Sequence, residues 1–108
     1  MTPTASETAF ETLTNIGYDL TVLMRGVFSD DFVHDSLVGV WAGECWDVIL
    51  TIARQFVYDG LTASPEAIAL MRQAHDLVQS WDYEDASIQD ELHQLEKDIA
   101  TVTPKVVA

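Results

Sequence analysis

Residues 37–58, LVGVWAGECWDVILTIARQFVY, form the most apolar stretch of the chain. Its polar residues, Glu44, Asp47, Thr51 and the pair at 54–55, follow at steps of three and four, which places them on one narrow stripe of an α-helix. Because the rest of the circumference is apolar or small, we expect this helix to lie in the interior. Its charged residues interrupt the run before about 20 uncharged residues accumulate, which excludes a membrane span.

Signals on both sides extend this stretch to a central helix over about residues 31–59. Ser29 is a candidate N-cap followed by two acidic residues, and Gly60 suits the C′ position that ends a helix. Gly39 and Gly43 lie inside the helix, where each costs roughly 1 kcal/mol relative to Ala, so a kink or a restart is expected there. Their spacing of four places both glycines on one face, which predicts the close approach of a neighbouring helix.

Three other helices are predicted from apolar spacing and capping residues. The first follows a capping box at residues 4–7 and runs to about Phe28. The third begins at Ser64-Pro65-Glu66 and extends to Trp81, and the fourth is capped by Ser87 and ends before Pro104. The connections are short, so the chain is predicted to be all-α: an up-and-down four-helix bundle in a single domain, residues 1–108.

Length and composition limit the class of protein. A chain of 108 residues supports one domain, and a hydrophobic content of 48% argues against disorder. The single cysteine, Cys45, lies in the apolar stretch and cannot form an internal disulfide, which indicates a reduced, intracellular setting. No charged-then-apolar leader opens the sequence, so we expect a cytoplasmic protein, in the host cytoplasm if a phage encodes it.

Charge is the most unusual property of the chain. Eighteen acidic residues oppose five basic ones, for a net charge of −13. Because neutralising phosphates requires Lys and Arg, direct binding of nucleic acid is excluded as a default. A surplus of this sign favours partners with basic surfaces, since the field attracts them and speeds their encounter.

The acidic residues are densest in the last third of the chain, around the start of the fourth helix. Carboxylates fixed along a rigid helix imitate a phosphate backbone, and neighbouring aromatic residues can anchor such a contact. We expect Asp82, Glu84, Asp85, Asp90 and Glu91 to form one exposed face. The predicted partner-binding residues are Asp76, Trp81, Asp82, Tyr83, Glu84, Asp85, Asp90 and Glu91.

In size and charge the chain is similar to small acidic helical proteins that phages encode against bacterial defence, such as anti-CRISPR and anti-restriction inhibitors. This resemblance implies a non-enzymatic inhibitor that occupies the nucleic-acid site of a basic protein. A salt-adapted surface would also be rich in Asp and poor in Lys, as this one is. A third hypothesis is a structural subunit that forms a homodimer through the two-glycine face or its surplus Trp surface.

Two patterns suggest weaker metal hypotheses. Asp31 with His34, and Asp90 with His93, have the acid-x-x-His spacing of di-iron bundles. Those sites also need inward glutamates from two other helices, and only Glu44 is an obvious donor. Glu44-Cys-Trp-Asp47 resembles the Glu-x-x-Asp motif of all-helical, magnesium-dependent nucleotide pyrophosphohydrolases, but no second acidic pair is evident. No catalytic residue, metal site or cofactor is therefore predicted.

Overall fold

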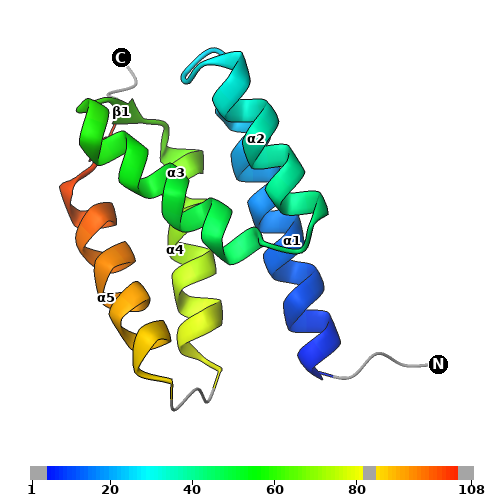
Figure 1. Cartoon of the computed structure of the whole chain (residues 1–108). Helices are drawn as coiled ribbons and strands as arrows, with labels where there is room; N and C mark the ends of the chain where they lie inside the picture. Colours follow the sequence, from blue (N-terminus) through cyan, green and yellow to red (C-terminus); the bar gives the residue numbers. More distant parts are fainter. Residues whose placement is uncertain (1–4, 82–84, 105–108) are drawn as a thin grey trace.

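Five α-helices make up most of the molecule, and the computed structural model describes residues 5–81 and 85–104. They are α1 (Ala5–Leu23), α2 (Asp30–Trp41), α3 (Cys45–Asp59), α4 (Pro65–Gln79) and α5 (Ala86–Thr101). In Figure 1, α4 and α5 form a hairpin on one side, α1 and α2 lie on the other, and α3 crosses between them. The predicted all-α bundle is confirmed, but the predicted helix over 31–59 is two helices.

The break between α2 and α3 lies at Gly43, one of the two positions where a restart was expected. Gly43 has a φ of +82°, a left-handed conformation that costs glycine little and other residues more. The turn is closed by the amide of Glu44, which donates to the carbonyl oxygen of Gly39 at 2.9 Å. Gly43 therefore forms a corner between α2 and α3, not a helix-packing surface.

Gly39 has the role that the sequence predicted for both glycines. A Cβ atom at this position would lie 2.6 Å from Cγ2 of Val48 on α3, closer than two such carbons can approach. The absence of a side chain at Gly39 thus allows α2 to pack closely against α3. Gly17 serves similarly on α1, where a Cβ would lie 3.3 Å from Cβ of Cys45.

The corner turns part of the apolar stretch outward. Trp41 is 70% exposed and Val38 is 47% exposed, so the expectation that the whole stretch is interior is wrong for these residues. α2 packs against α1 and α3, which cover only one of its sides. The second half of the stretch does form the core of α3, where Ile49, Ile52 and Phe56 are buried.

Most of the predicted caps are confirmed. The Ser29 and Ser64 hydroxyls accept hydrogen bonds from the amides of Phe32 and Ala67, each at 3.2 Å, at the starts of α2 and α4. Gly60 has a φ of +64°, and the amide beyond it closes the end of α3. The first helix ends at Leu23, short of the predicted Phe28, and Thr4 of its capping box lies outside the described residues.

The core lies where α3 crosses the other helices. α1, α3, α4 and α5 all contribute to its largest buried side chains, and the ring centroids of Phe28 and Phe56 lie 4.9 Å apart. The predicted apolar seam of α5 is buried at Leu92, Leu95 and Ile99. Burial of these side chains is the main stabilising contribution to the bundle.

A short parallel pairing was not predicted. β1 (Thr62–Ala63), between α3 and α4, pairs with β2 (Thr103–Pro104), which follows α5. This pairing holds the end of α5 against the α3–α4 connection. Within residues 5–81 and 85–104, no helix combines the length and apolar character that crossing a bilayer requires.

Candidate protein-binding site

The predicted partner-binding residues that the structure describes lie near the turn of the α4–α5 hairpin, at the lower end of the molecule in Figure 1. Asp76 is in the last turns of α4, Trp81 follows that helix, and Asp85 precedes α5. The acidic side chains of Asp76 and Asp85 are exposed, whereas Trp81 is half-buried. The predicted residues Asp82, Tyr83 and Glu84 lie outside the described residues.

Asp85, not the predicted Ser87, caps α5. Oδ1 of Asp85 accepts hydrogen bonds from the Ser87 amide at 2.8 Å and from the Ser87 hydroxyl at 2.7 Å. These bonds, from the hydroxyl first and the amide second, stabilise the ionised carboxylate and lower the pKa of Asp85. Asp85 therefore has a structural role besides its contribution to the acidic surface.

Asp90 and Glu91 are neighbours in sequence but line different hollows. Asp90 lines a shallow, polar depression on the outer side of α5, together with His93 and Lys97. Glu91 is half-buried and faces the side of α5 that packs against α3. The hairpin end therefore presents these two acids in different directions.

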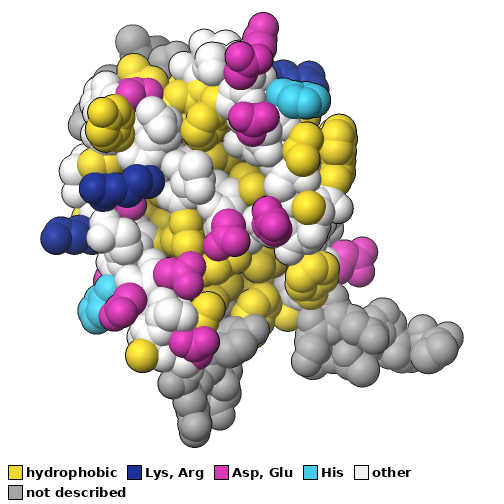
Figure 2. Space-filling model, viewed as in Figure 1, with side chains coloured by type: hydrophobic (Ala, Val, Ile, Leu, Met, Phe, Trp, Pro, Cys, Tyr) yellow, Lys and Arg dark blue, Asp and Glu magenta, His cyan; other side chains and the backbone are white. Residues whose placement is uncertain are grey.

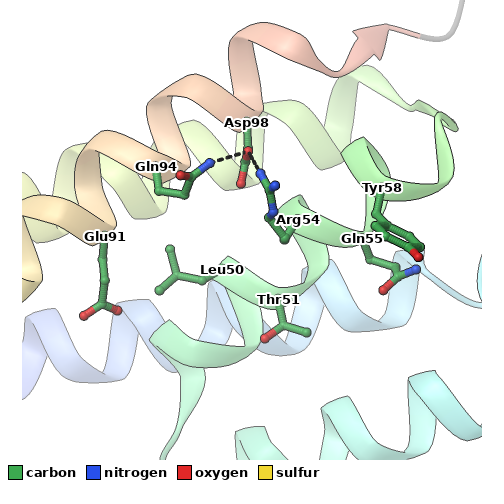
Figure 3. A pocket seen from close by; sticks show the side chains of 8 residues that line it. All are labelled: Leu50, Thr51, Arg54, Gln55, Tyr58, Glu91, Gln94 and Asp98. Atoms are coloured by element: carbon green, nitrogen blue, oxygen red, sulfur yellow. Dashed lines mark hydrogen bonds and ion pairs between the residues drawn. The ribbon is translucent and has the colours of Figure 1, made fainter.

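The groove between α3 and α5 holds the ion pair of the site. Nη1 of Arg54 donates to Oδ1 of Asp98 at 2.9 Å, and Nε2 of Gln94 donates to the same oxygen at 2.9 Å. Figure 3 shows both side chains directed at this carboxylate, with Leu50 beneath them and Tyr58 at one end of the groove. Asp98 is buried, so the ion pair and the amide satisfy a carboxylate that water reaches poorly.

A second cavity, about 350 Å³ in volume, lies beside this groove and shares Glu91 with it. Its wall combines carboxylates and aromatic rings from α1, α3, α5 and the segments next to them. We call it the acidic hollow and define it by Phe10, Glu44, Trp46, Asp47, Trp81 and Glu91. Figure 2 shows acidic side chains next to apolar ones on the face of the molecule where α3 and α5 lie.

Trp46 contributes an unsatisfied polar atom to this region. Its indole Nε1 is buried and has no hydrogen-bond partner among residues 5–81 and 85–104, although a buried N–H group is normally paired. Trp46 lines the acidic hollow together with Trp81. The hollow therefore combines carboxylates and aromatic rings in its wall.

The sequence predicted that Glu44 and Asp47 lie on the polar, solvent-exposed stripe of the central helix, and both are exposed as expected. It did not place them near Glu91, which lies more than forty residues later in the chain. No local signal joins the three, because their proximity depends on how α3 packs against α5. The structure therefore brings part of the predicted site together with two acids that were not predicted for it.

The remaining carboxylates are spread over the molecule. Except for the half-buried Glu91 and the buried Asp98, every acidic side chain whose burial the structure describes is exposed. Each of the five helices carries at least one of them, including Asp19 on α1 and Asp35 on α2. Exposed acidic residues are thus not confined to the fourth predicted helix, because every other helix also carries them.

The two acid-x-x-His pairs of the metal hypotheses lie on separate helices, α2 and α5. His34 is exposed on α2 and His93 is exposed on α5. Among residues 5–81 and 85–104, no group of three or more His, Cys, Asp or Glu side chains has an arrangement that could hold a metal ion. Comparison of the chain with family models, with curated proteins and with solved structures finds no match.

Proposed function

We propose that this protein binds a basic surface of a nucleic-acid-binding protein and thereby blocks that surface from nucleic acid. In this hypothesis it acts without catalysis, as an anti-CRISPR or anti-restriction inhibitor would, in the cytoplasm of the cell that contains its target. The observation that carries the proposal is the large surplus of exposed carboxylates on a rigid helical scaffold. Such a surface attracts basic partners over distances comparable to the Debye length, about 8 Å at physiological salt.

Internal ion pairs neutralise little of this surplus. Four basic residues other than histidine are described, and one of them, Arg54, forms an ion pair within the described part of the chain. Its partner Asp98 is buried, so this ion pair neutralises none of the exposed acids. The exposed acids are therefore available to an external cation.

The spread of carboxylates modifies the expected form of binding. An inhibitor that used one helix alone would need few acids elsewhere, whereas this chain has exposed acids on all five helices. The distribution favours a partner whose basic surface surrounds part of the bundle. We propose that the α4–α5 end, with Asp76, Asp90 and Glu91, makes the central contact, since it also carries half-buried aromatic surface at Trp81.

Displacement from immobilised DNA tests this proposal. Proteins of a plausible host lysate are bound to a DNA column at low salt, and the purified acidic protein is then added. We expect it to release a small, reproducible set of DNA-binding proteins at low salt. At high salt, we expect addition of the protein to release no more DNA-binding protein than the high-salt buffer alone does. High salt screens the attraction that drives the exchange.

Two charge-matched variants test the location of the contact. One carries Asp76→Lys, Asp90→Lys and Glu91→Lys at the α4–α5 end, and the other carries Asp19→Lys, Asp35→Lys and Asp59→Lys on α1, α2 and α3. Both change the net charge equally. We expect the first to lose displacement and the second to retain it; equal loss would contradict a contact at the hairpin end, and no displacement by the unmodified protein would overturn the proposal.

The exposed face of α2 favours a second candidate, a homodimer. Val38 and Trp41 are one helical turn apart and are both largely exposed, which is unusual for such apolar side chains. Two copies of so acidic a chain repel each other, so salt should strengthen a dimer but weaken binding to a basic partner. Sedimentation at several salt concentrations, with Trp41→Ser as the comparison, separates the two candidates.

A further inference from the structure

We propose that the acidic hollow receives an arginine side chain of the partner protein. This inference rests on the proposed function, because it specifies which group of a basic partner makes the central contact. The hollow has a volume of about 350 Å³, within the range of cavities that bind small groups. None of the described residues that line it is Lys, Arg or His.

Charge complementarity selects a cation for the hollow. Glu44 and Asp47 come from the start of α3, and Glu91 comes from α5, so carboxylates line the hollow from two different elements. Glu91 is half-buried, so water competes less for its oxygens than for those of a fully exposed acid. A cation in the hollow would be attracted by all three carboxylates.

The aromatic wall selects arginine over lysine. Phe10, Trp46 and Trp81 line the same hollow as the carboxylates. A guanidinium group is planar and weakly hydrated, so it stacks on aromatic faces while its N–H groups bind carboxylates in pairs. The compact, strongly hydrated ammonium of lysine gains less from such a site.

The hollow can be tested with a defined probe. The probe is a blocked nonapeptide with one central arginine and neutral flanking residues; its two counterparts replace arginine by lysine or by the uncharged isostere citrulline. Binding is followed through the indole N–H resonances of the three tryptophans in ¹⁵N-labelled protein. We expect the arginine peptide to shift the resonances of Trp46 and Trp81 and to leave Trp41 unchanged, because Trp41 is exposed on α2 and does not line the hollow.

The counterpart peptides test the chemistry. We expect the lysine peptide to bind at least threefold more weakly than the arginine peptide, and the citrulline peptide to cause no saturable shift. Equal binding of citrulline and arginine would overturn the role of charge. Shifts at Trp41 equal to those at Trp46, or no saturable shift at Trp46, would overturn the assignment to the hollow.

Two neutral triple variants complete the test. Glu44→Gln with Asp47→Asn and Glu91→Gln removes the charges of the hollow, and Asp19→Asn with Asp35→Asn and Asp59→Asn removes an equal charge elsewhere. Glu44 precedes α3 without a side-chain capping hydrogen bond, so its change removes no cap. We expect the first variant to bind the arginine peptide at least tenfold more weakly than the second, with helicity retained in both.

The DNA column separates this inference from the proposed function. If the unmodified protein displaces DNA-binding proteins but the arginine peptide never binds the hollow, the inference fails and the proposed function stands. If the unmodified protein displaces nothing, the proposed function fails, whatever the peptide does. Both hold if the hollow variant loses both activities and its matched control keeps them.

Discussion

Arg54 on α3 donates to the buried carboxylate of Asp98 on α5, at a distance of 2.9 Å between Nη1 and Oδ1. The two residues differ in exposure: the Arg54 side chain is 60% exposed and that of Asp98 is 5% exposed. Without this ion pair, the buried charge of Asp98 would keep Gln94 as its one side-chain donor within the described residues. It also connects the helix that crosses the bundle to the helix that carries much of the acidic surface.

Removing the arginine should destabilise the fold. In Arg54→Ala, Asp98 loses its cationic partner, and we expect a decrease of about 1–3 kcal/mol in the free energy of unfolding. The matched control is Arg72→Ala, an exposed arginine of α4 that has no ion pair within the described residues. Urea denaturation measures both variants, and equal stabilities for the two would show that the ion pair contributes nothing.

The Asp85 cap should make the fold sensitive to acid. The pKa of Asp85 is lowered in the folded state, chiefly by the Ser87 hydroxyl, so its contribution to stability is present above the unfolded pKa of about 3.9. That contribution is lost as the pH falls through the lower, folded pKa. In Asp85→Asn the amide oxygen still accepts the bonds, so we expect the cap to remain but this part of the acid dependence to disappear.

The comparison variant for this residue is Asp85→Ala, which removes the acceptor itself. We expect it to lower the melting temperature at neutral pH more than Asp85→Asn does. Melting curves from pH 2.5 to pH 7 measure both effects. A melting temperature for Asp85→Ala equal to that of the unmodified protein would argue against the cap.

Gly39 offers a test in which the sign of the effect matters. Alanine in an open helix interior stabilises by about 0.5–1 kcal/mol relative to glycine. Here the added Cβ would lie 2.6 Å from Cγ2 of Val48, so we expect Gly39→Ala to destabilise by about 1–3 kcal/mol. In a Val48→Ala background, Gly39→Ala should cost less stability than it does in the unmodified protein. If Gly39→Ala were more stable than the unmodified protein, the close contact of α2 with α3 would be contradicted.

The corner at Gly43 depends on its left-handed backbone. Any residue with a Cβ is disfavoured at a φ of +82°, and we expect Gly43→Ala to cost about 1–2 kcal/mol. Asparagine tolerates this conformation better, so Gly43→Asn should cost less. If both variants matched the unmodified protein in urea denaturation, α2 and α3 would not need this turn.

Salt distinguishes a partner-binding surface from a salt-adapted one. The surplus charge repels itself, so added salt should raise the melting temperature modestly. Under the proposed function the bundle stays folded at about 0.01 M ionic strength, where the Debye length is about 30 Å. Loss of helical circular dichroism at that ionic strength would favour salt adaptation.

Features that depend on neighbouring residues were predictable from the sequence. Ser29, Ser64 and Gly60 act as caps because their side chains or backbone preferences meet the needs of a helix end within a few residues. The prediction of the apolar seam of α5 was also correct, since burial follows the helical period. The prediction of Ser87 as the cap of α5 was wrong, because Ser and Asp both cap helices well and the actual cap, Asp85, lies only two residues earlier.

Features that depend on packing were not predictable. Gly39 and Gly43 have the same intrinsic cost in a helix, and only the position of Val48 and the turn after α2 assign them different roles. The acidic hollow likewise joins residues that are distant in sequence, so no spacing rule indicates it. The exposure of Trp41 follows from the same corner, because the break leaves α2 covered on only one side.

The β1–β2 pairing has a practical consequence for attaching the protein to a surface. It holds Thr103 and Pro104 beside the α3–α4 connection, at the end of α5 that is remote from the hairpin turn (Figure 1). α5 has 16 residues and therefore separates the two ends by roughly 24 Å. Biotin or an affinity tag joined after the last residue would leave the α4–α5 end free, so immobilised protein should present the acidic hollow to its ligands in one uniform orientation.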